Sequence, residues 1–172
     1  VVIALMLVIV GVPGILIGNA RASEYGTTST GSNDLLIITT DICETQANRL
    51  ADWKRDVGFT VTVKQTPDIS DRIEQGKQIR SMIQNEFSDN DLISGDFVLL
   101  FGDAYDPNTN PKNRIPTKMT DTNSCSDSIY SRIEGAWNDW YKKGSNPDVC
   151  VGRVPVNTAI EAENYVNKVI RY

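Results

Sequence analysis

The stretch "LLIITTDICETQANRLADWKRDVGFTVTV", residues 35–63, holds two strands and a helix between them. Residues 35–40 form an apolar run, typical of a strand buried on both faces of a parallel sheet. Residues 59–64 are β-branched and alternating, which predicts a second strand. Residues 43–56 place apolar side chains on one helical face, at Ala47, Leu50, Ala51 and Trp53. This order predicts a parallel pair of strands joined by a right-handed crossover.

The same alternation of elements continues downstream. Asp41 is expected to cap the first helix and Gly58 to end it. Residues 74–88 predict a second helix, because apolar side chains recur at helical spacing. Residues 97–102, "FVLLFG", predict a second fully buried strand.

Residues 103–147 break the pattern, since they are rich in proline, asparagine and aspartate and show little periodicity. We expect a long polar excursion there, with a hairpin near 128–141. Residues 149–154 return to strand character, and Thr158 with Glu161 forms a capping box that starts a last helix. The whole order predicts an α/β fold with three layers, in which helices cover both faces of a parallel sheet and the excursion precedes the last strand.

The composition limits the chemistry. The 172 residues include no histidine and carry a net charge of −5, with lysines and arginines scattered. Nucleic acid is not expected as a partner, because phosphate binding needs a basic face. Without histidine, these residues cannot form a Ser-His-Asp or Cys-His catalytic pair or the usual zinc site. No cofactor is predicted.

The first 22 residues are expected to be a signal peptide. Residues 1–18 are apolar, and Ala20-Arg21-Ala22 has the small-x-small pattern of a signal-peptidase site. Residues 23–34 then form a flexible lead-in to the folded part, residues 35–172. This predicts a secreted or cell-surface protein without stable membrane association after cleavage. The alternative is an uncleaved membrane anchor, for which the apolar run is just long enough.

Three cysteines accompany this predicted export. Cys43 and Cys150 are expected to be small buried core residues, and a bridge between Cys125 and Cys150 is the alternative. None has a histidine to activate it, so none is a convincing nucleophile.

Two acids follow predicted strands, where ligands bind in open parallel sheets. Asp41 is explained by helix capping, whereas Asp103 opens the excursion directly after a buried strand. Acids in these places also occur in response-regulator receivers, but the signal segment and the long insertion disfavour that class. The stretch "DTNSCSD", residues 121–127, is a weak calcium-loop candidate, because it lacks the usual glycine and closing glutamate.

Four segments together resemble gingipain-type cysteine peptidases. These are "LADWKRDVGFTVTV", "DFVLLFGDA", "SDSIYSRIEG" and "NPDVCVGRVPVNTAIEAENYVNKVIRY", which occur in the same order as in that family. The resemblance as a whole extends over residues 35–172. The resemblance implies a caspase-like fold, secretion, and peptide-bond hydrolysis by a cysteine with a histidine partner. In that family both catalytic residues lie in the second half of the domain, so none is assigned to a position here.

On this resemblance, the chain is expected to be the amino-terminal subdomain of a peptidase, with a polypeptide substrate and a downstream catalytic subdomain as partners. Asp103, Asp127, Tyr130 and Arg153 are expected to form a rim that faces substrate or that subdomain. Arg153 is expected to pair with Asp103 or Asp127, or else to be solvated. The alternative function is a non-catalytic binding or structural module with a peptidase-like fold at the cell surface.

Overall fold

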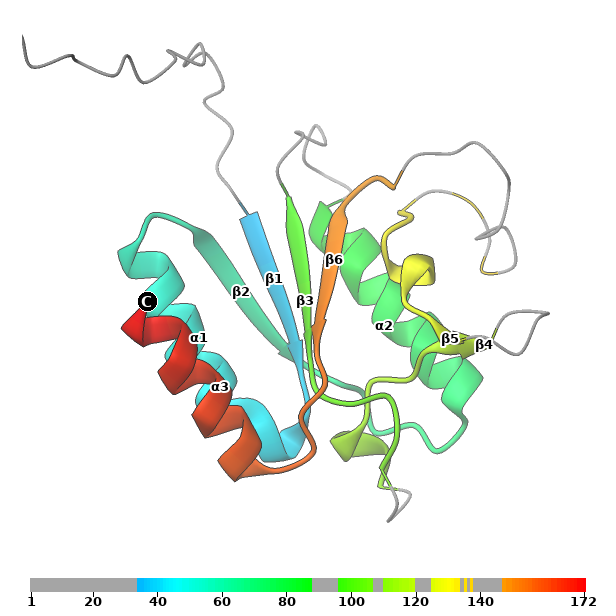
Figure 1. The fold of residues 1–172 in the computed structure, drawn as a ribbon. Helices are drawn as coiled ribbons and strands as arrows, with labels where there is room; N and C mark the ends of the chain where they lie inside the picture. Colours follow the sequence, from blue (N-terminus) through cyan, green and yellow to red (C-terminus); the bar gives the residue numbers. More distant parts are fainter. Residues whose placement is uncertain are drawn as a thin grey trace, which may run out of the picture. The chain divides into compact units, whose positions relative to one another are not determined.

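A four-stranded parallel sheet lies at the centre of the computed structural model (Figure 1). The strands are β1 (Asp34–Thr39), β2 (Thr60–Gln65), β3 (Phe97–Phe101) and β6 (Cys150–Val154). Their spatial order is β2-β1-β3-β6, and each neighbouring pair is parallel. The parallel sheet predicted from the alternation of elements is confirmed.

The structure describes residues 34–87, 96–106, 110–119, 125–133, 135, 137 and 147–172. The expected signal peptide, and the expected lead-in up to residue 33, lie outside these ranges. Among the described helices, none is long and apolar enough to cross a membrane.

Helices cover both faces of the sheet. α1 (Glu44–Asp56) and α3 (Ala159–Arg171) pack on one face and α2 (Arg72–Phe87) on the other (Figure 1). The apolar alternation of β1 explains this arrangement, because Leu35 and Ile37 belong to the core under α1 and α3, while Leu36 and Ile38 belong to the core under α2. A strand with two buried faces must be largely apolar, as residues 35–38 of this one are.

The starts and ends of the helices agree in part with expectation. Gly58 ends α1 with a φ of +98°, and its N–H bonds the carbonyl of Arg55, so this prediction is confirmed. The capping role expected for Asp41 is wrong: Asp41 begins a short 3-10 turn, η1 (Asp41–Cys43), and neither this turn nor α1 has a side-chain capping bond. Instead, Asp71 caps α2 by accepting from the N–H groups of Ile73 and Glu74 at 2.8 and 2.9 Å.

The capping box of α3 is confirmed. Thr158 Oγ1 accepts from the N–H of Glu161 at 3.2 Å, and the Glu161 carboxylate accepts from the N–H of Asn157, the residue before the N-cap, at 2.8 Å. The loop before α3 is therefore fixed at the point where β6 ends.

The excursion contains little regular structure. Its described parts hold η2 (Pro111–Asn113), a short antiparallel pair made of β4 (Lys118–Met119) and β5 (Cys125–Ser126), and η3 (Ser128–Tyr130). The hairpin expected near 128–141 is wrong over its first residues, which form η3. Most of its remainder lies outside the described residues.

The order of the strands creates a switch point between β1 and β3. The chain leaves β1 toward β2 on one side, and returns to β3 on the other. In such sheets, ligands bind beyond the carboxyl ends of the strands at the switch point. Here that place is formed by Thr40 after β1 and by Gly102 and Asp103 after β3.

Candidate functional site

Arg153 joins three segments at the carboxyl ends of β3 and β6. It pairs in register with Leu100, so its side chain leaves the sheet on the face where Leu100 is buried under α2. Its Nε and Nη2 donate to the two carboxylate oxygens of Asp127 at 2.8 and 2.7 Å. Its Nη1 donates to the carbonyl oxygen of Gly102 at 2.9 Å. One guanidinium thus connects β6, the end of β3 and the excursion.

This ion pair is largely withdrawn from solvent. The side chains of Arg153 and Asp127 are 12% and 27% exposed, and the two parallel bonds fix their mutual orientation. The partner is Asp127 rather than Asp103. The Asp127 carboxylate makes no capping bond to η3 and is held by the guanidinium instead.

Asp103 connects the loop after β3 to the loop before α3. Its Oδ1 accepts from the N–H of Ala104 at 2.6 Å, and its Oδ2 accepts from Nδ2 of Asn157 at 2.9 Å. Its own N–H donates to the carbonyl of Val156 at 3.1 Å. Asn157 was not singled out in the sequence, and only its place before the capping box could have indicated it.

Tyr130 lies completely buried at the end of η3. Its hydroxyl donates to the carbonyl oxygen of Pro116. Burial raises the pKa of Tyr130 far above its ordinary value, so the phenol stays neutral and serves as a hydrogen-bond donor rather than as a general acid or base.

Tyr130→Phe is therefore expected to lower the free energy of unfolding by about 1–2 kcal/mol, because the buried carbonyl of Pro116 loses its donor. Urea denaturation followed by tryptophan fluorescence measures the change. Tyr165→Phe is the matched control, since the Tyr165 hydroxyl lines an open groove and makes no hydrogen bond among the described residues. Equal losses in the two variants would contradict this role of the Tyr130 hydroxyl.

A buried polar cluster beside this site was missed. Gln75 is fully buried, and its Nε2 donates to Thr66 Oγ1 at 3.2 Å and to the carbonyl of Pro111 at 2.5 Å. Its Oε1 accepts from Nε of Arg114 at 3.0 Å. The sequence did contain a sign of this burial, because Gln75 lies four residues before Ile79 and therefore on the apolar stripe of α2. A polar residue in that phase predicts a buried hydrogen-bonded group.

Cys43 reaches the edge of this site, because its Sγ lies 4.0 Å from the carbonyl oxygen of Val156, which also accepts from the N–H of Asp103. Cys43 is buried as expected, and burial raises the pKa of its thiol, which disfavours the thiolate. The burial expected for Cys150 is wrong, because it begins an edge strand and is exposed. The alternative bridge between Cys125 and Cys150 is not formed, since both are free thiols.

Within the described ranges, no group of three or more cysteine, aspartate or glutamate side chains is gathered as a metal site. Most of the weak calcium-loop candidate, residues 121–124, lies outside those ranges.

The four predicted residues are thus linked through backbone and side-chain bonds. Arg153 and Asp127 neutralise each other, Asp103 is held by Asn157, and Tyr130 is a neutral donor. The sequence offers no imidazole to activate a nucleophile. This arrangement holds loops in place at the carboxyl ends of the strands, and it contains no complete set of groups for acid–base catalysis.

The sheet order, the helices on both faces and the loops held at the switch point define a doubly wound α/β subdomain. The model of peptidase family C25 matches residues 28–172, and the chain belongs to this family. Among solved structures, the chain is similar to dimeric latent PorU from Porphyromonas gingivalis, with 20% identity and a TM-score of 0.58. The match covers 80% of this chain and 15% of that one. No curated protein matches significantly.

The gingipain-type resemblance drawn from four segments is therefore confirmed, and so is the caspase-like α/β fold that it implied. Peptidase family C25 consists of cysteine peptidases and their relatives, which relates this chain to proteins that act on polypeptides. The chain spans 15% of the length of the solved relative.

Proposed function

We propose that this chain is the amino-terminal part of a secreted cysteine endopeptidase, whose catalytic histidine and cysteine lie downstream of these residues. The observation that carries the proposal is the family match over residues 28–172 in a sequence without histidine. A thiol needs an adjacent base to act as a nucleophile at neutral pH. The base must then come from outside the sequence.

The rim formed by Asp103, Asp127, Tyr130 and Arg153 supports this proposal. It lies at the carboxyl ends of the strands, where α/β folds place their ligands. We propose that the rim orients the loops that face substrate or the downstream catalytic subdomain. Polypeptide is the proposed substrate, in keeping with the family.

Export of the protein is part of the same proposal. Residues 1–18 are apolar and precede Ala20-Arg21-Ala22, so we expect the mature chain to begin at Ser23 and to be released or displayed at the cell surface. Amino-terminal sequencing of the exported protein tests this, and a membrane-bound form that keeps residues 1–22 would indicate an anchor instead.

The 172 residues alone are expected to hydrolyse no peptide bond, whereas the full-length product hydrolyses a peptide library. In the active protein, iodoacetamide is expected to abolish activity by alkylating a cysteine outside residues 1–172, which peptide mapping identifies. Inactivation that follows alkylation of Cys43, Cys125 or Cys150 would overturn the proposal. A full-length protein without peptidase activity would favour the alternative, a non-catalytic module.

The rim can be tested separately at Asp103. In the full-length enzyme, Asp103→Ala is expected to lower kcat/KM by about tenfold or more, while stability falls by only about 0.5–2 kcal/mol, as for a lost capping acid. Asn157→Ala is the matched control, since it removes the bond at 2.9 Å but leaves the carboxylate. Losses of activity that only follow losses of stability in both variants would make Asp103 a loop-forming residue.

A further inference from the structure

The outer edge of β6 carries backbone groups that point away from the sheet. The N–H of Cys150 donates to Asp96 and the carbonyl of Val154 accepts from Gly102, so these residues turn their backbone toward β3. In a parallel strand, alternate residues turn the opposite way. The N–H and carbonyl groups of Val151 and Arg153 therefore point outward, and no described strand pairs with them.

The other edge of the sheet, β2, is protected. The outward carbonyl of Val61 accepts from Nη2 of Arg55 at 2.8 Å. Lys64 on the same strand is paired with Glu86 at 2.5 Å. Capped carbonyls and charged side chains keep other strands from adding to an edge. Among the described residues, no side chain caps an outward carbonyl of β6 in this way, and the guanidinium of its one charged residue, Arg153, is turned onto Asp127 and Gly102.

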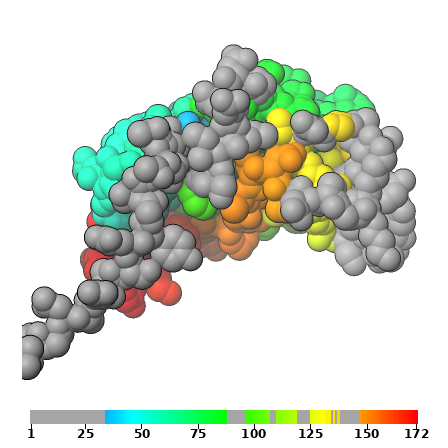
Figure 2. All heavy atoms as spheres, turned by 90° about the horizontal axis from the view of Figure 1, so that it is seen from above, coloured from blue at the N-terminus to red at the C-terminus, as the bar shows by residue number. Residues whose placement is uncertain are grey.

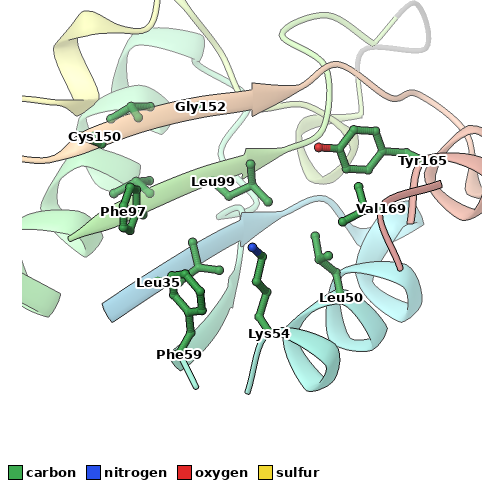
Figure 3. A pocket seen from close by; sticks show the side chains of 12 residues that line it. Leu35, Leu50, Lys54, Phe59, Phe97, Leu99, Cys150, Gly152, Tyr165 and Val169 are labelled. Carbon is green, nitrogen blue, oxygen red and sulfur yellow. The ribbon is translucent and has the colours of Figure 1, made fainter. Parts of the chain in front are cut away.

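An apolar groove of about 440 Å³ runs along the α1/α3 face of the sheet from β6. Figure 3 shows Cys150 and Gly152 of β6 beside Phe97 and Leu99 of β3 in this groove. Phe97, the first residue of the central strand β3, is 37% exposed. Parallel sheets normally bury both faces, so this part of the face lacks the usual cover.

A second hollow, of about 320 Å³, lies beside β6 and η3, and it shares Cys150 and Val151 with the groove. Its other lining residues include Ser128 and Ser131, and the carbonyl of Ser131 already accepts from the N–H of Val149 at 3.2 Å. Figure 2, a view from the amino ends of the strands, shows the orange atoms of the β6 segment at the surface beside the yellow atoms of the excursion.

Among the described residues, none packs so closely on Gly152 that a glycine is required there. A Cβ added there would come no closer than 4.0 Å to any atom, the nearest being Leu99 Cδ1. A glycine inside a strand often marks a place where another backbone approaches closely. Here it leaves the floor of the groove flat beside the open edge.

We propose that the open edge of β6 binds an extended polypeptide segment, which adds to the sheet as a fifth strand. The outward groups of Val151 and Arg153 supply the main-chain hydrogen bonds. Successive side chains of an added strand point to opposite faces, so they enter the groove and the second hollow in turn. The occupant is a strand with apolar side chains toward the groove, which Phe97 and Leu99 line, and small polar ones toward the second hollow, which Ser128 and Ser131 line. Strand addition obtains its specificity from such alternate pockets. This proposal does not depend on peptidase activity.

The probe is a fluorescein-labelled heptapeptide of alternating valine and threonine, titrated against the intact protein by fluorescence anisotropy. Val151→Pro removes an outward N–H but no bond to β3, and Gly152→Val fills the floor of the groove. Each is expected to weaken binding by about tenfold or more, since one lost hydrogen bond or contact suffices for that factor. A fully N-methylated peptide is expected not to bind.

Val63→Pro is the matched control, because Val63 has the corresponding outward position on β2, and it is expected to leave binding unchanged. Without peptide, hydrogen exchange should show the amides of residues 151 and 153 unprotected. Protection of these amides, or equal binding by wild type, Val151→Pro and Gly152→Val, would overturn the proposal. So would a protein that binds no peptide but forms a dimer that Val151→Pro abolishes. If Val151→Pro fails to fold, Gly152→Val and the N-methylated peptide decide.

Discussion

Arg153→Ala is expected to lower the free energy of unfolding by about 3 kcal/mol, since removing one partner of a buried ion pair leaves the other charge uncompensated. Asp127 would keep a carboxylate that is only 27% exposed, without its two bonds. The carbonyl of Gly102 would also lose its donor. Chemical denaturation at neutral pH measures the loss. The residues around η3 should also lose protection from hydrogen exchange, because the guanidinium attaches the excursion to the sheet.

Matched variants separate charge from geometry at this position. Arg153→Lys keeps the charge but cannot make two parallel bonds and a third to Gly102, so an intermediate loss is expected. In a double-mutant cycle, Arg153→Ala and Asp127→Ala should be coupled by about 1–3 kcal/mol. Additive losses, or a variant as stable as the wild type, would show that the pair contributes nothing to stability.

Gly102→Ala is the second large effect, with an expected loss of about 3 kcal/mol from overpacking and backbone strain. A Cβ at this position would lie 2.5 Å from Cγ2 of Thr40 and 3.3 Å from Cδ1 of Ile115. The φ of Gly102, +159°, is also one that other residues rarely adopt. Thermal and urea unfolding measure the change.

The crowded contact itself provides a rescue. Thr40→Ser removes Cγ2, so Gly102→Ala should cost less in the Thr40→Ser background than in the wild type. Gly152→Ala is the control, because the nearest atom to its Cβ would be Leu99 Cδ1 at 4.0 Å, and stability should change by less than about 0.5 kcal/mol. Equal losses of stability in Gly102→Ala and Gly152→Ala would show that close packing at the switch point does not require a glycine at position 102.

Much of the fold follows from local patterns in the sequence. The buried strand at 35–40, the alternating strand at 59–64 and the helix between them appear within about one residue of their predicted bounds. Such elements are predictable because each must bury one face or two, and the spacing of apolar residues records which. The helix end at Gly58 and the Thr158–Glu161 capping box were also predictable, because each involves backbone groups only a few residues away in the sequence.

The errors occur where the outcome depends on distant segments. Asp41 stands where a cap is expected, but the chain first makes a 3-10 turn. Cys150 has an apolar neighbourhood in the sequence, yet it is exposed, because the order β2-β1-β3-β6 places its strand at the edge. The local sequence does not reveal whether a strand is central or at an edge, because the order of the strands depends on the path of the crossover connections between them.

The sequence by itself therefore determined the alternation of strands and helices, the apolar faces and the family. Tertiary structure alone decided that Arg153 selects Asp127 rather than Asp103, that Gln75 is buried among polar partners, and that β6 is an edge strand of the described sheet. The physical reason is one of range. Hydrophobic periodicity and capping act within about one or two turns of the chain, whereas these pairings join residues far apart in the sequence, where only the packed fold sets the distances.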